Sequence, residues 1–263
     1  MNKKIKIRDA FDHGKAFIGF VTGGDPSLEA SREIILNMVE AGCDLIEIGI
    51  PFSDPIAEGP VIQEANIRAL AAGATVDKIF GLAAEVRERT EVPLVFLTYL
   101  NPVFRYGYDR FCKKCEECGV NGLIIPDMPY EERGELEGFA KAHEVDMISL
   151  IAPTSEERTR MIAEQASGFI YAVSSMGVTG IRSEISAHIG AAVSAIKEAA
   201  HVPVAVGFGV NTPEQAAGIG RSADGVIVGS AIVRLIEKYG AGAGRYVYDY
   251  VKTMKAAMIN GCP

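Results

Sequence analysis

The sequence predicts a (β/α)8 TIM barrel that forms a single domain over residues 1–263, and three observations support this prediction. Short β-branched runs alternate with amphipathic helical stretches along the whole chain. Eight such strand–helix units fit into about 250 residues, the usual size of this barrel. No linker rich in Pro, Gly or Ser divides the chain. The alternative is a doubly wound open sheet, but no G-x-G-x-x-G fingerprint follows the first strand.

The expected strands are eight runs rich in β-branched residues. They cover residues 16–22, 45–50, 93–99, 122–127, 147–152, 168–174, 202–208 and 224–230. Helices are expected between them, with Ser27 and Thr154 as N-caps and Pro213 in a first helical turn after Thr212. Insertions follow the second strand, at about 51–92, and the sixth, at about 174–185. In a barrel, both insertions lie over the C-terminal ends of the strands, which carry the active site.

Composition and charge limit the classes of function. The chain is 48% apolar and 23% charged, with a net charge of -8 and a pI near 5.2. Its Lys and Arg residues are dispersed, which argues against nucleic-acid binding. The N-terminal residues lack the apolar core of a signal peptide, and no apolar run approaches the roughly 18 residues of a membrane span. We therefore expect a cytoplasmic protein.

Three of the five Cys residues, Cys112, Cys115 and Cys118, stand in the short stretch "CKKCEEC". The stretch has helical spacing and ends at a Gly, so the three thiols are neighbours on one helix. One helix cannot easily surround a metal with three thiolates, and tetrahedral sites and clusters usually need four ligands. We therefore expect helix packing and no metal site.

No His or Lys is predicted at the C-terminal end of a strand. His13 precedes the first strand, His143 and His188 lie in helices, and His201 ends a helix. A Schiff-base mechanism needs a Lys that is aimed into the barrel. A His-based metal site, a His general base and an imine mechanism are therefore all disfavoured.

One carboxylate, Glu47, stands inside an apolar strand, in "DLIEIGIP". Because side chains alternate along a strand, Ile46 and Ile48 face the helices and Glu47 points into the barrel near its C-terminal mouth. Burial is costly for a carboxylate and raises its pKa, and an acid titrating near neutrality can both donate and accept a proton. No Lys or Arg is predicted at a strand end to pair with it. We therefore predict a catalytic acid/base rather than a packing role.

Further polar candidates lie at strand ends and in the loops that follow. Asp54 and Glu58 come after Glu47, over the expected barrel mouth, and could supply a second catalytic carboxylate. Asp127 ends the fourth strand, and Tyr99 and Tyr171 lie on the third and sixth. Each Tyr has two interpretations, a ligand contact or core packing with one hydrogen-bonded hydroxyl.

Three Gly-containing loops predict a phosphate site. "GFGVNTPEQA" and "VIVGSAIV" follow the seventh and eighth strands, and "GVTG" follows the sixth. Each offers backbone N–H groups at or near a helix start, where an anion is favoured, and barrels often bind phosphate there. The residues thus predict a phosphate-holding barrel enzyme with carboxylate acid–base chemistry. Proton abstraction, isomerisation and retro-aldol cleavage are all compatible with it.

Seven motifs span nearly the whole chain in order: "GFVTGGDPS", "EIGIPFSDP", "TYLNPVF", "PDMPYEE", "GVTG", "VGFGVNTPEQA" and "VGSAIV". Together they closely resemble the tryptophan synthase alpha subunit family. That family is a (β/α)8 barrel which cleaves indole-3-glycerol phosphate to indole and glyceraldehyde 3-phosphate, a retro-aldol step. The resemblance therefore implies a lyase of tryptophan biosynthesis with no cofactor in this chain.

The resemblance also implies roles for individual residues. Glu47 matches the family's general acid/base, which protonates the indole ring carbon and helps to deprotonate the glyceryl hydroxyl. Glu58 occupies the position of the second carboxylate, which contacts the indole N–H. With the strand-end Asp127 included, the expected substrate-binding residues are Phe20, Ile62, Tyr99, Asp127, Tyr171 and Thr179, the last in a loop that closes over substrate. The expected phosphate-binding residues are Gly180, Gly209, Gly229 and Ser230.

One position departs from the family. Its usual loop reads "ADGP", whereas this chain reads "AEGP", so Glu58 is one methylene longer than the usual Asp. A displacement of about 1 Å can cost on the order of 100-fold in rate. The alternative to an active lyase is therefore a weakly active or non-catalytic subunit that binds a phosphate ligand and regulates its partner. A related phosphate-barrel isomerase or synthase of the same pathway is a third interpretation. The synthase needs a cationic acid, and the absence of a Lys at a strand end argues against it.

The implied partner is a tryptophan synthase beta subunit. The family works as an alpha2beta2 complex in which beta carries pyridoxal phosphate and receives indole directly. The insertion after the second strand is where the family's alpha subunit meets beta, so Asp54 is expected to organise the loop or contact the partner. Pyridoxal phosphate is expected only on that subunit, and neither nucleic acid nor membrane is an expected partner.

Overall fold

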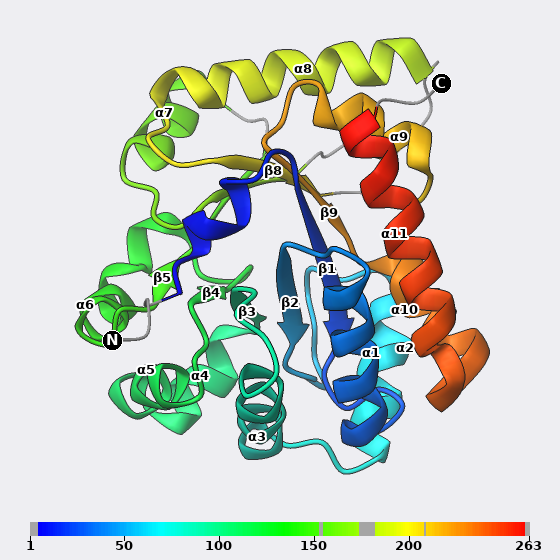
Figure 1. Ribbon diagram of the computed structural model, residues 1–263. Coiled ribbons are helices and arrows are strands. Elements are labelled where there is room, and N and C mark those ends of the chain that lie inside the picture. Colours follow the sequence, from blue (N-terminus) through cyan, green and yellow to red (C-terminus); the bar gives the residue numbers. More distant parts are fainter. Residues whose placement is uncertain (1–4, 153–154, 174–181, 208, 261–263) are drawn as a thin grey trace.

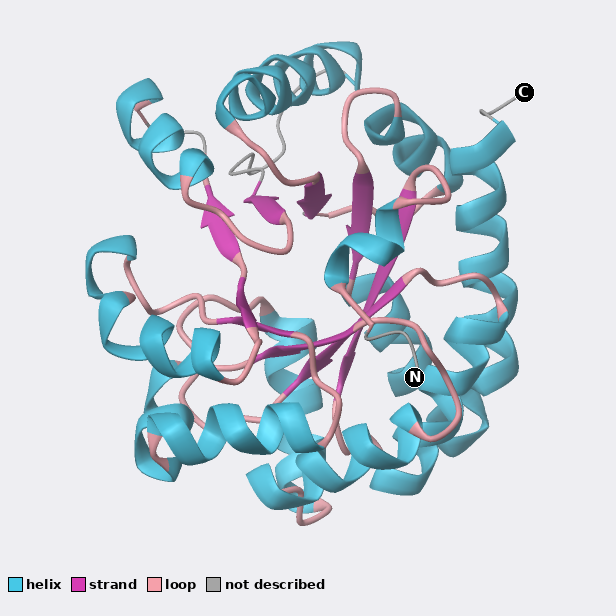
Figure 2. Ribbon diagram, turned by 60° about the vertical axis from the view of Figure 1, so that its left-hand side comes forward, coloured by secondary structure: helices cyan, strands magenta, loops and turns pink. Residues whose placement is uncertain are grey.

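The computed structural model describes residues 5–152, 155–173, 182–207 and 209–260. Nine parallel strands form one sheet that rolls into a nearly closed barrel, and helices surround it (Figure 1, Figure 2). The strand order is β5-β4-β3-β2-β1-β9-β8-β7-β6. The predicted fold class is confirmed.

The strands match the eight predicted runs, except that the fifth run is split in two. They are β1 (Ala16–Thr22), β2 (Leu45–Gly49), β3 (Leu94–Leu97), β4 (Gly122–Ile124), β5 (Asp146–Met147), β6 (Ser149–Ile151), β7 (Ile170–Val173), β8 (Val204–Gly207) and β9 (Gly225–Val228). The split falls at Ile148, whose N–H donates to the Leu123 carbonyl at 2.9 Å. β5 pairs with β4 and β6 pairs with β7, so the two ends of the strand order are joined by one residue of the chain.

The helices fill the predicted intervals. They are α1 (Leu28–Glu40), α2 (Pro60–Ala71), α3 (Val76–Arg87), α4 (Leu100–Tyr106), α5 (Tyr108–Glu117), α6 (Gly134–Ala142), α7 (Glu156–Glu164), α8 (Arg182–Ala199), α9 (Pro213–Gly220), α10 (Ser230–Tyr239) and α11 (Gly244–Asn260). The 3-10 helices are η1 (Ile7–Phe11), η2 (Tyr130–Glu132) and η3 (Gly240–Ala243). The insertion after β2 thus consists of a loop followed by α2 and α3.

Most of the predicted helix starts are confirmed. The Ser27 hydroxyl accepts a hydrogen bond from the Ala30 N–H, and Pro213 begins α9 behind the N-cap Thr212. The predicted cap of α7 is wrong by one residue. Ser155 is the N-cap, with its hydroxyl accepting from the Arg158 N–H, and Thr154 lies outside the described residues. Both residues carry a hydroxyl, so sequence preference alone did not separate them.

The two thiols of α5 and that of its C-cap residue, Cys118, belong to the core. Cys112 and Cys115 have no exposed surface and Cys118 is 5% exposed, and all three pack with apolar side chains between the sheet and the helices. The predicted packing role is confirmed. Over the described part of the chain, no three or more His, Cys, Asp or Glu side chains are grouped to hold a metal ion. Within the same residues, no helix is long and apolar enough to cross a membrane.

The core has two layers, inside the barrel and outside it. The inner layer holds alternate strand residues such as Ile18, Leu45 and Ile227, and the outer layer lies against the helices and holds Ile46 and Ile48. This is the alternation that the sequence predicts. Residues of η1 pack into the inner layer as well. Apolar side chains therefore fill the barrel interior, and the C-terminal ends of the strands are left for polar side chains.

Candidate active site

Glu47 is buried on β2, two residues beyond Leu45 of the inner layer. Its neighbours in the sheet are Phe20 on β1 and Val95 on β3. The side chain is 1% exposed, and its Oε2 atom has no hydrogen-bond partner. Burial, followed by the negative charge of Glu58, raises the pKa of Glu47 to about 8. At neutral pH, Glu47 is therefore mainly a neutral carboxylic acid that can donate a proton.

Glu58 lies in the loop between β2 and α2 and is half-buried. The Asn66 side-chain amide donates to its Oε2 atom at 2.6 Å, and the Gln63 side chain donates to its backbone carbonyl at 2.7 Å. Burial raises the pKa of Glu58, while hydrogen bonds from Asn66 and Tyr99 act in the opposite direction. The two carboxyl groups are close enough for the charge of Glu58 to affect Glu47. The structure thus brings together the two predicted catalytic residues.

Two Tyr residues stand beside the carboxyl pair. Tyr99, 1% exposed, ends the loop before α4, and its hydroxyl accepts from the Ala57 N–H at 3.1 Å. Burial raises the pKa of Tyr99 to about 12. Burial also raises the pKa of Tyr171, and the negative charge of Glu47 adds to that increase. Both hydroxyls therefore stay protonated and can donate hydrogen bonds at neutral pH.

Phe20 and Ile62 form an apolar cluster above β1 with Ala65 and Val233. Phe20 is 6% exposed and Ile62 is 9% exposed. The two predicted pocket residues are thus brought together, one from β1 and one from α2. Their contact with substrate stays a prediction.

Asp127 supports the site through α4. Its Oδ1 atom accepts a hydrogen bond from the Leu100 N–H at 2.9 Å, at the first residue of that helix. A carboxylate at this position satisfies a free backbone donor, and the positive end of the helix dipole stabilises its negative charge. Because Tyr99 immediately precedes the helix, Asp127 helps to fix the Tyr99 backbone. Its predicted substrate contact stays a prediction.

The described part of the predicted phosphate site lies at the starts of two helices. Gly209, with φ at +64°, precedes α9, but Thr212 and Gln215 already cap that helix. Gly229 precedes α10, where no side chain caps the first N–H groups, and Ser230 is the first residue of that helix. An uncapped helix start can receive an anion. Thr179 and Gly180 lie outside the described residues.

Sequence reasoning missed Asn66, which is 3% exposed and points its amide at Glu58. The available signal was its position, because Asn66 shares the buried stripe of α2 with Ile62, Ala65 and Ala69. A polar residue on a buried stripe needs a partner. Asp54, by contrast, is exposed and accepts a hydrogen bond from its neighbour Ser53.

A partly buried ion pair near the site was also missed. Asp25 follows β1, is 1% exposed and accepts two hydrogen bonds from the Arg68 guanidinium of α2, at 2.9 and 2.8 Å. This ion pair joins the loop after β1 to α2, the helix that carries Asn66. The motif "GGDPS" contains this Asp, but nothing in the sequence identifies Arg68 as its partner.

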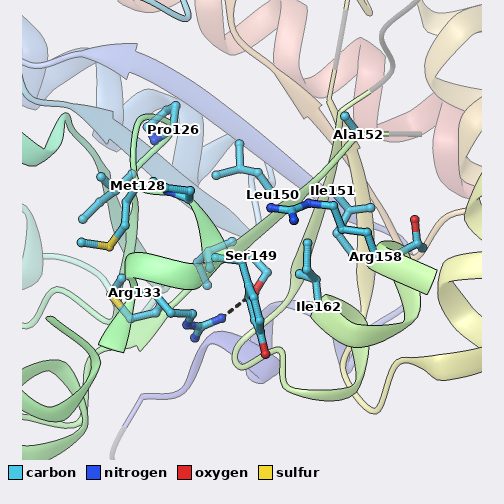
Figure 3. A pocket seen from close by; sticks show the side chains of 15 residues that line it. Pro126, Met128, Arg133, Ser149, Leu150, Ile151, Ala152, Arg158 and Ile162 are labelled. Carbon is cyan, nitrogen blue, oxygen red and sulfur yellow. Dashed lines mark hydrogen bonds between the residues drawn. The ribbon is translucent and has the colours of Figure 1, made fainter. Parts of the chain in front are cut away.

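A separate cavity of about 240 Å³ lies where the fifth predicted strand is split (Figure 3). Its walls come from the segment after β4, from β6 and from α7. In Figure 3, Arg133 points toward Ser149, and its Nη1 atom donates to the Ser149 hydroxyl at 3.1 Å. None of the predicted site residues that the structure describes lines this cavity. It is therefore distinct from the carboxyl pair.

Comparisons with known proteins agree with the geometry. The model of the tryptophan synthase alpha chain family matches residues 8–259. The tryptophan synthase alpha chain of Lacticaseibacillus casei is 47% identical over 253 residues, which are 96% of this chain and 95% of that protein. The alpha chain of Lactiplantibacillus plantarum is 49% identical over 249 residues, or 94% of each protein.

Solved structures show the same likeness. The alpha subunit from Legionella pneumophila superposes with a TM-score of 0.86 at 36% identity, covering 94% of this chain and 93% of that chain. Mycobacterium tuberculosis tryptophan synthase gives 0.87 at 35% identity, with 97% and 99% covered. A chain of the Pyrococcus furiosus a2b2 complex gives 0.85 at 33% identity, with 92% and 98% covered. Sequence and structure together show that this chain belongs to the tryptophan synthase alpha chain family, which are lyases of tryptophan biosynthesis.

Proposed function

We propose that the chain cleaves indole-3-glycerol phosphate to indole and glyceraldehyde 3-phosphate by a retro-aldol reaction. The observation that carries this proposal is the buried Glu47 carboxyl, unpaired at Oε2, with Glu58 beside it. Such a pair offers one neutral acid and one carboxylate to the same substrate. Family membership favours this reaction over proton abstraction or isomerisation.

Glu47 is proposed to carry out both proton transfers of the reaction. As the neutral acid it donates to the indole ring carbon that bears the glyceryl chain, which makes the ring a leaving group. The resulting Glu47 carboxylate accepts the proton of the neighbouring glyceryl hydroxyl as the carbon–carbon bond breaks. The bonding electrons return to the indole ring and the hydroxyl carbon becomes the aldehyde. Glu47 ends protonated, and a pKa of about 8 suits both transfers.

Glu58 is proposed to stabilise the charge that this protonation creates. Positive charge develops on the ring nitrogen, and a carboxylate that accepts its N–H bond lowers the energy of that state. The hydrogen bonds to Glu58 support this assignment because they favour its charged form. Glu58 therefore acts as the electrostatic partner of Glu47.

The remaining predicted residues supply binding. Phe20, Ile62 and Tyr171 are proposed to hold the indole ring, and the N–H groups near Gly229 and Ser230 to hold the phosphate. Binding the substrate at both ends is proposed to hold the reacting carbon over Glu47. This lowers the entropic part of the activation free energy of the reaction.

A beta subunit is the proposed partner, in an alpha2beta2 complex such as the one named for Pyrococcus furiosus. Pyridoxal phosphate is assigned to that subunit, and this chain is proposed to need no cofactor. Indole passes from this chain to the partner, and the insertion after β2 is the proposed contact region.

The test is indole release from indole-3-glycerol phosphate by the purified chain, with and without a beta subunit. We expect turnover that increases when the partner is added. Absence of indole in both conditions would contradict the proposed reaction. If the chain nevertheless raised the activity of beta, the non-catalytic regulatory interpretation of Glu58 would be correct.

A further inference from the structure

We propose that Asn66 is a positioning residue that fixes the Glu58 carboxylate and makes Glu58, rather than Glu47, the charged member of the acid pair. The contact that carries this inference is the 2.6 Å hydrogen bond from the Asn66 amide to Glu58 Oε2. Asn66 is 3% exposed and lies on the buried stripe of α2, so its amide cannot swing into solvent. The inference deepens the proposed function and rests on it for the catalytic consequence.

The geometry fixes Glu58 at two points. Oε2 is occupied by Asn66, and the backbone carbonyl of Glu58 is held by Gln63 at 2.7 Å. A glutamate has more freely rotating bonds than an aspartate, so a loop glutamate needs a fixed partner to keep its carboxylate in one place. Asn66 supplies that partner from the buried stripe of α2, and it holds the carboxylate at Oε2.

The two carboxyl groups differ in their donors. Glu47 has an oxygen with no partner, whereas Glu58 receives the Asn66 amide and a hydrogen bond from Tyr99. A carboxylate that accepts hydrogen bonds is favoured in its charged form, and two adjacent acids cannot both ionise easily. The donor from Asn66 therefore directs the negative charge to Glu58 and the proton to Glu47.

The other groups around the pair do not reverse this assignment. Tyr99 faces Glu58 from the start of α4, and Tyr171 faces Glu47 from β7. The negative charge of Asp127, in the loop after β4, adds to the raised pKa of Tyr99. Neither Tyr ionises near neutral pH, because burial raises the pKa of both. No cation affects the pKa of Glu47 or Glu58 among the described residues.

A double-mutant cycle with the chain bound to a beta subunit tests the catalytic role. We expect Asn66→Ala to lower kcat on the order of 10- to 100-fold, with a smaller change in KM, because a hydrogen bond to a charged group is lost. In a Glu58→Ala background, the same change should alter kcat by less than about 2-fold. Equal losses in the two backgrounds would show that Asn66 acts on the fold and would overturn the inference.

Gln63→Ala is the matched control. Like Asn66, Gln63 lies on α2 and donates a side-chain amide hydrogen bond to Glu58. Its bond goes to the Glu58 backbone carbonyl rather than to the carboxylate. We expect its kcat to stay within about 3-fold of the parent chain, since a neutral hydrogen bond contributes less. Asn66→Asp, which is nearly isosteric, provides a second variant should Asn66→Ala unfold. It should lower kcat at least as much, because a second carboxylate would then face Glu58.

An NMR titration of the Glu58 carboxyl carbon tests the charge assignment without any turnover. Removing the Asn66 donor should raise the pKa of Glu58, because its charged form loses a hydrogen bond, and should leave it unchanged in Gln63→Ala. An unchanged pKa in both Asn66 variants would overturn the inference. If the parent chain releases no indole but the pKa rises as expected, the proposed reaction fails and the Asn66 assignment stands.

Discussion

The aromatic ring of Phe20 on β1 lies against Gly49 on β2, where a Cβ atom on residue 49 would stand 2.8 Å from Phe20 Cζ. The same ring lies beside Gly229, where a Cβ atom would stand 3.4 Å from it. Phe20 can therefore lie across the barrel mouth only because two neighbouring strand ends carry no side chain. Gly49 is also the next inward-facing residue after Glu47, so the ring and the carboxyl share one space.

Gly49→Ala is expected to displace Phe20 and damage both stability and substrate binding. The added methyl group would overlap a ring that has little room to move, at a cost of about 1–3 kcal/mol in the free energy of unfolding. We expect a raised KM for indole-3-glycerol phosphate, with urea unfolding measured in parallel. Gly81→Ala is the control, because Gly81 is exposed in α3 with open space around it. That variant should be as stable as the parent or slightly more stable.

Glu47→Gln should abolish turnover and preserve the fold. The amide keeps the shape of the neutral acid but cannot give up or accept the proton, so we expect kcat to fall by at least about 100-fold. Binding of a phosphate-containing ligand should survive, because the proposed phosphate contacts lie at the start of α10 and not on β2. Indole release and ligand binding by calorimetry are the two measurements. Activity near that of the parent chain would remove Glu47 from its proposed role.

The sequence was sufficient for the features that depend on local pattern. The alternation in β2 correctly placed Ile46 and Ile48 outside the barrel and Glu47 inside it. The alternation of strands and helices gave the barrel, because a parallel sheet with short connections has few other solutions. These predictions succeeded because period and side-chain direction are properties of a few adjacent residues.

Features that depend on distant contacts were not predictable in the same way. The fifth run is continuous in sequence, and only its pairing with β4 on one side and β7 on the other splits it at Ile148. Asn66 resembles an ordinary polar helix residue until α2 is docked against the loop that carries Glu58. Arg68 likewise finds Asp25 across 43 residues of chain. Such pairs are set by packing between elements, which one sequence does not reveal.

The stability of the chain should fall as the pH rises from about 4.5 to about 8, in part because of Glu47. Its pKa rises from 4.5 to about 8 on folding, so the folded chain binds this proton more tightly than the unfolded chain. Its contribution is complete below pH 4.5 and decreases from there to about pH 8, because Glu47 ionises in the unfolded chain while it stays protonated in the folded one. Urea unfolding across this interval should give a flatter pH dependence for Glu47→Gln. Identical slopes in the two proteins would contradict the raised pKa.

Breaking the Asp25–Arg68 pair should destabilise the fold more than breaking an exposed pair. Arg68→Met leaves the Asp25 carboxylate buried without its cation, which costs about 3–5 kcal/mol. Arg32→Met is the control, because Arg32 pairs with the exposed Glu85 and the change should cost about 0–1 kcal/mol. The double variant Asp25→Asn/Arg68→Met should recover part of the loss, since no buried charge remains. Equal unfolding free energies for Arg68→Met and Arg32→Met would show that the pair contributes little, and that the loop after β1 is held to α2 by its apolar contacts.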